Sequence, residues 1–164
     1  MAAWHEASSA LMSKAVIVTA TTVRTGRHLA RVVLQGDDGR IGTAEFEFAA
    51  SLHECRGVGL SGVMLGSVTG NQFAPTIRVA NEAFGYVEVY GTPPGGQAPV
   101  VLFDIDGGLP VKATLSPTRE VDRWMAIASL PVSSLALGDH AITATANSAA
   151  GKTCKAEGVF RKIS

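Results

Sequence analysis

Three consecutive residues, His53, Glu54 and Cys55, carry side chains that could bind a transition metal. In an extended strand, His53 and Cys55 would point to the same side because their positions differ by two. Zinc takes about four ligands, or three and a water, and the chain offers only His5 and Cys154 as further distant candidates. Because this ligand set is incomplete, we expect no metal site. A metal-dependent hydrolase is the remote alternative.

Residues 57–62 (GVGLSG) match the GxGxxG pattern of dinucleotide-binding proteins. That pattern works where the glycines open a helix whose N-terminus receives the pyrophosphate. The residues that follow contain Gly66, Gly70 and Pro75, which argue against a helix. We therefore expect a glycine-rich linker that leads into a strand, and no nucleotide cofactor.

Residues 104–108 (DIDGG) begin like a calcium loop, but an EF-hand loop counted from Asp104 would need a carboxylate at Leu115. A hairpin turn explains the segment better. The chain also lacks the GxSxG setting of a nucleophilic serine. We therefore expect no catalytic residues, no bound cofactor and no enzyme activity.

The composition favours short strands joined by tight turns. Of the 164 residues, 18 are Gly and 7 are Pro, while 46% are hydrophobic, which is enough for a buried core. The 14 basic and 14 acidic residues balance, so the chain has no basic surface for nucleic acid. A net charge near zero also favours association, because the self-repulsion between molecules is small.

No segment reaches the ~18 to 20 apolar residues of a membrane-spanning helix. The nearest, residues 15–23, follows Lys14 and contains three threonines, so it predicts a strand rather than the core of a signal peptide. No export signal is visible. The cysteines, Cys55 and Cys154, are too few for a disulfide scaffold, and their redox state stays open.

The chain contains an internal repeat, in which residues 26–48 match residues 138–160 without gaps at an offset of 112. Each copy reads as a strand, a turn that ends in Gly and a second strand, which predicts a β-hairpin. Six of the 23 positions are identical: Gly26 and Gly138, His28 and His140, Gly39 and Gly151, Ala44 and Ala156, Glu45 and Glu157, Phe48 and Phe160.

Both predicted hairpins have one apolar side, while Arg27 and Arg31 of the first copy point the other way. Cys154, on the apolar side, is expected to be a small buried hydrophobe. The inward residues are His28, Ala30, Val32, Leu34, Ala44, Phe46 and Phe48 in the first copy, and His140, Ile142, Ala144, Ala146, Cys154, Ala156 and Phe160 in the second.

Around seven short strands predict an all-β, Greek-key, immunoglobulin-like sandwich over residues 51–164. Residues 1–50 match only its last strands, with residues 15–23 as a third strand, which predicts a partial sandwich of about three strands. The strand-like runs before the second hairpin are residues 60–68, 76–80, 84–90, 100–105, 111–115 and 124–130, the last with an inner row of Trp124, Ala126, Ala128 and Leu130.

His28 and His140 recur at equivalent positions and each follows a Gly by two residues. A residue at this corner of a sandwich can hydrogen-bond the backbone, as the corner tyrosine of immunoglobulin-like domains does. We therefore expect a structural role for both histidines rather than a catalytic one.

The segment Leu130-Pro131, Leu135, Gly138-Asp139-His140 is similar to the ending of bacterial immunoglobulin-like domains. Residues 64–66 (MLG), 71–75 (NQFAP) and 86–91 (YVEVYG) resemble the tail domains of large bacterial von Willebrand factor A-related proteins. This resemblance implies an extracellular or cell-surface protein with a structural or adhesive role. Two departures are that no von Willebrand domain is present, and that histidine stands where tyrosine is usual.

Three strands cannot bury both faces of a two-layer fold, so residues 1–50 need a partner: the second domain, another copy of the chain or another β protein. We therefore expect a non-enzymatic structural or interaction module that assembles by strand complementation, swapping or edge pairing, and that forms filaments if the contact is head-to-tail. The alternative is an extracellular carbohydrate- or peptide-binding module that uses loops 68–74 and 92–99.

Overall fold

The computed structural model describes residues 23–164, except residues 56, 70–71, 92–97 and 148–152. Every regular element in this part is a β-strand, which confirms the all-β prediction. The strands are β1 (Gly26–Gln35), β2 (Ile41–Ala50), β3 (His53–Cys55), β4 (Val58–Leu60), β5 (Met64–Thr69), β6 (Gln72–Thr76), β7 (Arg78–Val79), β8 (Ala83–Tyr90), β9 (Val100–Ile105), β10 (Val111–Lys112), β11 (Thr114–Pro117), β12 (Arg123–Leu130), β13 (Gly138–Asn147) and β14 (Thr153–Lys162).

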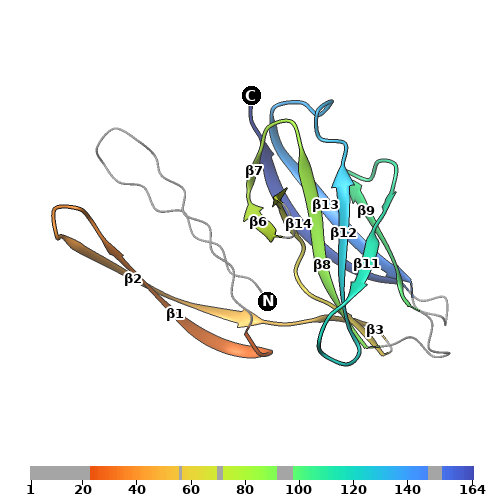
Figure 1. Ribbon diagram of the computed structural model, residues 1–164, viewed down its shortest axis with the longest axis horizontal. Coiled ribbons are helices and arrows are strands. Elements are labelled where there is room, and N and C mark those ends of the chain that lie inside the picture. Colours follow the sequence, from red (N-terminus) through yellow and green to blue (C-terminus); the bar gives the residue numbers. More distant parts are fainter. Residues whose placement is uncertain (1–22, 56, 70–71, 92–97, 148–152) are drawn as a thin grey trace.

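Strands β3 to β14 form two sheets that face each other in a β-sandwich arrangement (Figure 1). One sheet has the order β10-β9-β13-β14-β7, and the other has the order β11-β12-β8-β4-β3 with β5 and β6 attached beside β8. Strand β7 pairs with β14 in parallel, and the other strand pairings described within the two sheets are antiparallel.

The core lies between the two sheets because alternate residues of each strand point inward. Val87 and Val89 of β8 and Phe103 of β9 are fully buried. The ring of Phe103 covers Gly85, where an added Cβ would lie 2.9 Å from a ring carbon. The predicted inner row of β12 is confirmed, since Ala126, Ala128 and Leu130 are buried and Trp124 packs against the core.

Three predicted strands are divided in the structure. Residues 76–80 fall on β6 and β7, which belong to different sheets. Residues 60–68 fall on β4 and β5, and residues 111–115 fall on β10 and β11, which belong to different sheets. The change of sheet occurs at Ala113, which is buried and donates its N–H to the carbonyl of Val101. The prediction of one continuous strand over residues 111–115 was therefore wrong. Residues 100–105 form β9 as predicted.

Strands β1 and β2 form a two-stranded antiparallel sheet of their own, which extends away from the sandwich in Figure 1. Arg27 and Arg31 face outward as predicted, and they form ion pairs with Glu47 and Glu45 across the ribbon. The predicted third strand, residues 15–23, lies outside the described residues except for Val23, which is not in a strand.

The turn between β1 and β2 is a tight one. Gly36 donates its N–H to the carbonyl of Arg40, and Gly39 donates its N–H to the carbonyl of Gly36, both at 2.9 Å. Gly39 has φ +77°, a left-handed conformation that glycine adopts freely, and this agrees with the predicted turn that ends in Gly. The corresponding turn of the second hairpin, residues 149–151, lies outside the described residues.

A disulfide bond joins Cys55 of β3 to Cys154 of β14, with a Cα–Cα distance of 5.5 Å. Because β3 and β14 belong to different sheets, the bond ties the two layers together. Cys154 is buried and faces inward as predicted, but the interpretation of this residue as a simple hydrophobe was wrong. The two cysteines are 99 residues apart, so nothing local in the sequence pairs them.

Candidate functional site

The β1–β2 hairpin repeats the β13–β14 hairpin in structure as well as in sequence. His28 lies opposite Phe48, and His140 lies opposite Phe160, so the two registers coincide when 112 is added to each number. The histidine and phenylalanine rings stack, with their centroids 5.4 Å apart in the first hairpin and 5.5 Å apart in the second. The offset found in the sequence therefore relates two equivalent hairpins.

Both histidines form the corner hydrogen bond that the sequence predicts. Nε2 of His28 donates to the carbonyl oxygen of Arg24 at 2.6 Å. Nε2 of His140 donates to the carbonyl oxygen of Ala136 at 2.8 Å. In both cases the acceptor lies four residues upstream, and the corner tyrosine of immunoglobulin-like domains likewise bonds to backbone a few residues upstream. The structural role expected for these residues agrees with this geometry.

An aspartate from a neighbouring strand completes the corner in the sandwich. Asp106, which follows β9, places Oδ2 at 2.6 Å from Nδ1 of His140 and accepts the N–H of Ala141 on Oδ1 at 2.9 Å. The Asp106 N–H in turn donates to the carbonyl of Ala141 at 3.0 Å. The hydrogen bond raises the pKa of His140 above its usual value and lowers that of Asp106. Both shifts favour the charged form of the pair.

Residues 23–50 contain no counterpart of β9 or Asp106. The structure gives Nδ1 of His28 no hydrogen-bond partner among the described residues. Gly36 and Arg40 face each other as a hydrogen-bonded pair at the end of the ribbon. Hydrogen-bonded pairs alternate with non-bonded pairs along an antiparallel ladder. The N–H and C=O groups of the even-numbered residues of β1 therefore point toward β2, and those of the odd-numbered residues point away from it. The N–H and C=O of Leu29 therefore point to the outer edge of β1, where no described strand pairs with them.

The outward face of the β1–β2 hairpin carries large apolar side chains. Leu29, Val33 and Ile41 are 65%, 57% and 66% exposed. The positions 112 residues later hold the smaller or more polar Ala141, Thr145 and Thr153. Exposed apolar side chains that gather on one face are typical of interaction surfaces. At these three positions the first hairpin is more apolar than the second, although Val159 of the second hairpin is also exposed where the first has Glu47.

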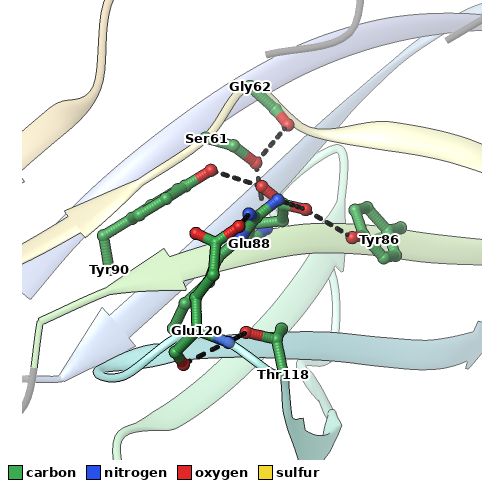
Figure 2. Close-up of polar contacts among 8 residues, drawn as sticks. Ser61, Gly62, Tyr86, Glu88, Tyr90, Thr118 and Glu120 are labelled. Carbon is green, nitrogen blue, oxygen red and sulfur yellow. Dashed lines mark hydrogen bonds and ion pairs between the residues drawn. The ribbon is translucent and has the colours of Figure 1, made fainter. Parts of the chain in front are cut away.

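A second cluster lies on the outer face of the other sheet and is centred on Glu88 of β8 (Figure 2). Its carboxylate accepts hydrogen bonds from the hydroxyls of Tyr86 and Tyr90 and from Arg123 of β12, the last at 2.6 Å. The Glu88 N–H donates to Oγ of Ser61 at 2.9 Å. The side chains of Glu88 and Arg123 are each 13% exposed, so the ion pair is largely shielded from water.

Charges in this cluster are fixed. Burial favours a raised pKa for Glu88, but the hydrogen bonds from Arg123, Tyr90 and Tyr86 outweigh it and lower the pKa below its usual value. Burial, reinforced by Glu88, raises the pKa of Tyr90 to about 12 and raises that of Tyr86 as well. A carboxylate held ionised and bonded on both oxygens is poorly suited to acid–base catalysis. The cluster joins β8 to β12 and to the residues after β4.

Sequence reasoning missed this cluster, although a signal was present. Tyr86, Glu88 and Tyr90 alternate along one strand, so they had to share a face. Arg123 could not be assigned to them, because its position opposite Tyr90 depends on the pairing of β12 with β8.

The proposed metal ligands do not come together. Cys55 and Cys154 are joined in the disulfide, His53 is exposed on β3, and His5 lies outside the described residues. The described residues hold no group of three or more potential metal ligands.

The other two motifs have structural roles. The middle of the GxGxxG segment, residues 58–60, is strand β4, so the expectation of a linker there was wrong. The turn that follows Asp104 leads from β9 into β10, which pairs with β9 as a hairpin. In this turn Gly107 donates its N–H to Oδ1 of Asp104 at 3.0 Å.

The loops considered for carbohydrate or peptide binding give no aromatic platform in the described residues. Loop 68–74 contributes largely to β5 and β6, and most of loop 92–99 lies outside the described residues. The Phe73 ring stacks on Tyr86 at 4.9 Å, and Tyr86 is buried.

No protein-family model matches this chain, and no curated protein is similar enough to count as a relative. Among the described residues there is no helix that could serve as a membrane span.

Proposed function

We propose that this chain is a non-enzymatic structural module that assembles with another β polypeptide through its β1–β2 hairpin. The observation that carries the proposal is the equivalence of the two hairpins. They share one register and one histidine corner, yet β13–β14 has a strand on each edge and β1–β2 has none among the described residues. The hairpin is built like the last two strands of a sandwich and needs the remaining strands.

The physical reason for assembly is the small size of the ribbon. A two-stranded hairpin is marginally stable in water, and its open edges are templates for strand pairing. Strand complementation, swapping and edge pairing would each satisfy these edges. A head-to-tail contact that does not close would produce a filament.

The strand order supports a Greek-key, immunoglobulin-like sandwich for residues 51–164, preceded by a partial sandwich in residues 1–50. Sequence neighbours are separated in the sheets, with β9 beside β13 and β8 beside β12, and β7 runs parallel to β14. The disulfide supports an extracellular or cell-surface location, because such bonds persist in oxidising compartments. Both features agree with the resemblance to bacterial immunoglobulin-like tail domains.

Light scattering coupled to size-exclusion chromatography tests the proposal. The full chain should show a molar mass above that of the monomer, and the mass should rise with protein concentration. A chain that lacks residues 1–50 should remain folded, keep its disulfide and elute as a monomer. Assembly through the hairpin would be refuted if the full chain stays monomeric at all concentrations and also forms no complex when it is mixed with a candidate β protein.

A further inference from the structure

We infer that the outer edge of β1 binds an antiparallel strand ending in an aspartate, whose carboxylate contacts His28 and the Leu29 N–H. This inference rests on the proposed function and deepens it, because it names the chemistry of the strand that the hairpin receives.

The sandwich supplies the internal precedent. Strand β9 pairs with β13 from Ile105 opposite Ile142 to Val100 opposite Asn147. At the end of this strand Asp106 makes three contacts, to Nδ1 of His140 and to the N–H and C=O of Ala141. The β13 edge therefore binds both the backbone of β9 and the aspartate that follows it.

The same three groups are present on β1 in the same arrangement. Nδ1 of His28 is fixed in direction because Nε2 bonds to Arg24 and the ring stacks on Phe48, as in the second hairpin. The N–H and C=O of Leu29 point to the outer edge. By the offset of 112, a strand in the β9 register would run from Ala30 to Gln35.

The backbone conformation at Asp106 and Gly107 further limits the sequence that the partner strand can have at its end. Asp106 has φ +51° and Gly107 has φ +71°, both in the left-handed region. Aspartate tolerates this region better than most residues, and glycine adopts it freely. The occupant is therefore an extended, alternately apolar strand that ends in Asp-Gly. It comes from a separate polypeptide segment rather than from β9 of a second copy, because β9 is already paired on both sides by β13 and β10.

A synthetic peptide with the sequence of residues 98–109 is the probe, added to the isotope-labelled full chain and followed by NMR. We expect saturable shifts of the Leu29 amide and the His28 ring nitrogens, with smaller effects on β13. A peptide carrying Asp106→Asn should bind roughly tenfold more weakly, because a charge-assisted hydrogen bond becomes a neutral one. A peptide of scrambled sequence is the control for nonspecific binding.

Two variants of the protein complete the test. His28→Tyr keeps a corner hydroxyl for the backbone bond but removes the second ring donor, and it should abolish the preference for Asp over Asn. Leu29→Pro removes the outer-edge N–H at a position where an edge strand tolerates proline, and it should weaken binding of both peptides. Retention of the wild-type spectrum outside the hairpin shows that each variant is folded.

The outcomes separate this inference from the proposed function. Equal binding of the Asp and Asn peptides, or no binding while the full chain still assembles through its hairpin, overturns the inference and leaves the proposed function standing. Asp-dependent binding by a chain that stays monomeric supports the inference and refutes self-assembly.

Discussion

Nδ1 of His140 lies 2.6 Å from Oδ2 of Asp106, and this contact joins the β13–β14 hairpin to the strand beside it. Nε2 of the same ring bonds to the carbonyl of Ala136. Because both ring nitrogens face acceptors, the doubly protonated imidazolium is the form that satisfies the site. The hydrogen bonds of this corner therefore depend on the protonation of the ring.

The His140–Asp106 pair predicts a pH dependence of stability. The pKa of His140 is raised in the folded chain, so its contribution is complete below the unfolded pKa of about 6.5 and is lost as pH rises through the folded pKa. The pKa of Asp106 is lowered, so its contribution is present above about pH 4 and is lost as pH falls through the folded pKa. The pair should therefore stabilise the fold most between about pH 4 and 6.5.

Urea unfolding of wild type and Asp106→Asn at several pH values measures this effect. Asparagine keeps the acceptor for the Ala141 N–H and tolerates the left-handed backbone, so the variant removes mainly the charge. The difference in free energy of unfolding should be largest near pH 5.5 and should shrink toward pH 8. A difference that stays constant across this range would contradict the assignment.

The disulfide should contribute strongly to stability. It closes a separation of 99 residues, for which the chain-entropy estimate is about 4 to 5 kcal/mol. The free energy of unfolding of the double variant Cys55→Ala/Cys154→Ala, measured by denaturant titration, should be lower than that of wild type by most of this amount. A reducing agent should lower the stability of wild type by a similar amount and leave the variant unchanged. If reduction has no effect on wild type, the two sheets do not depend on this bond.

The Glu88 cluster should hold the outer face of β8 and β12 together. Glu88→Gln leaves the shielded charge of Arg123 without its main partner, and we expect a loss of about 2 kcal/mol in the free energy of unfolding. Glu120→Gln is the matched control, because Glu120 also pairs with Arg123 but is 68% exposed and should cost less than about 0.5 kcal/mol.

An ultraviolet titration of tyrosinate gives a second readout for the same cluster. The pKa of Tyr90, about 12 in wild type, should fall in Glu88→Gln because Glu88 contributes to raising it. An unchanged titration with equal losses for Glu88→Gln and Glu120→Gln would count against the cluster.

Two glycines test the packing of the core. A Cβ at Gly85 would lie 2.9 Å from the Phe103 ring, so Gly85→Ala should destabilise the sandwich by about 1 to 3 kcal/mol. A Cβ at Gly42 of β2 would meet nothing within 4 Å, so Gly42→Ala should have little effect. The comparison uses thermal unfolding followed by circular dichroism. Similar melting temperatures for the two variants would show that the Phe103 ring does not pack closely against Gly85.

Much of the local structure could be predicted from the sequence, because it depends on contacts between near neighbours. The alternation of residues 100–105, the left-handed Gly39 and the two histidine corners follow from strand and turn chemistry. The repeat also predicted that residues 28 and 140 would be equivalent. These features need no knowledge of which strands pair across the fold.

Long-range pairings could not be predicted in the same way. The Cys55–Cys154 bond, the Arg123–Glu88 ion pair and the Asp106–His140 contact join residues separated by tens of positions. The change of sheet at Ala113 could not be predicted either, because a chain that passes from one sheet to the other keeps the same alternation of apolar residues. Each depends on strand order, which the pattern of one strand does not encode.

Hydrogen exchange at the outer edge of β1 tests assembly through the hairpin most directly. Residues 29, 31, 33 and 35 direct their N–H groups to that edge, so their amides should be unprotected in the dilute chain. In samples where light scattering shows assembly, these four amides should become protected. Assembled particles in which they exchange as fast as in the dilute chain would contradict assembly through this edge.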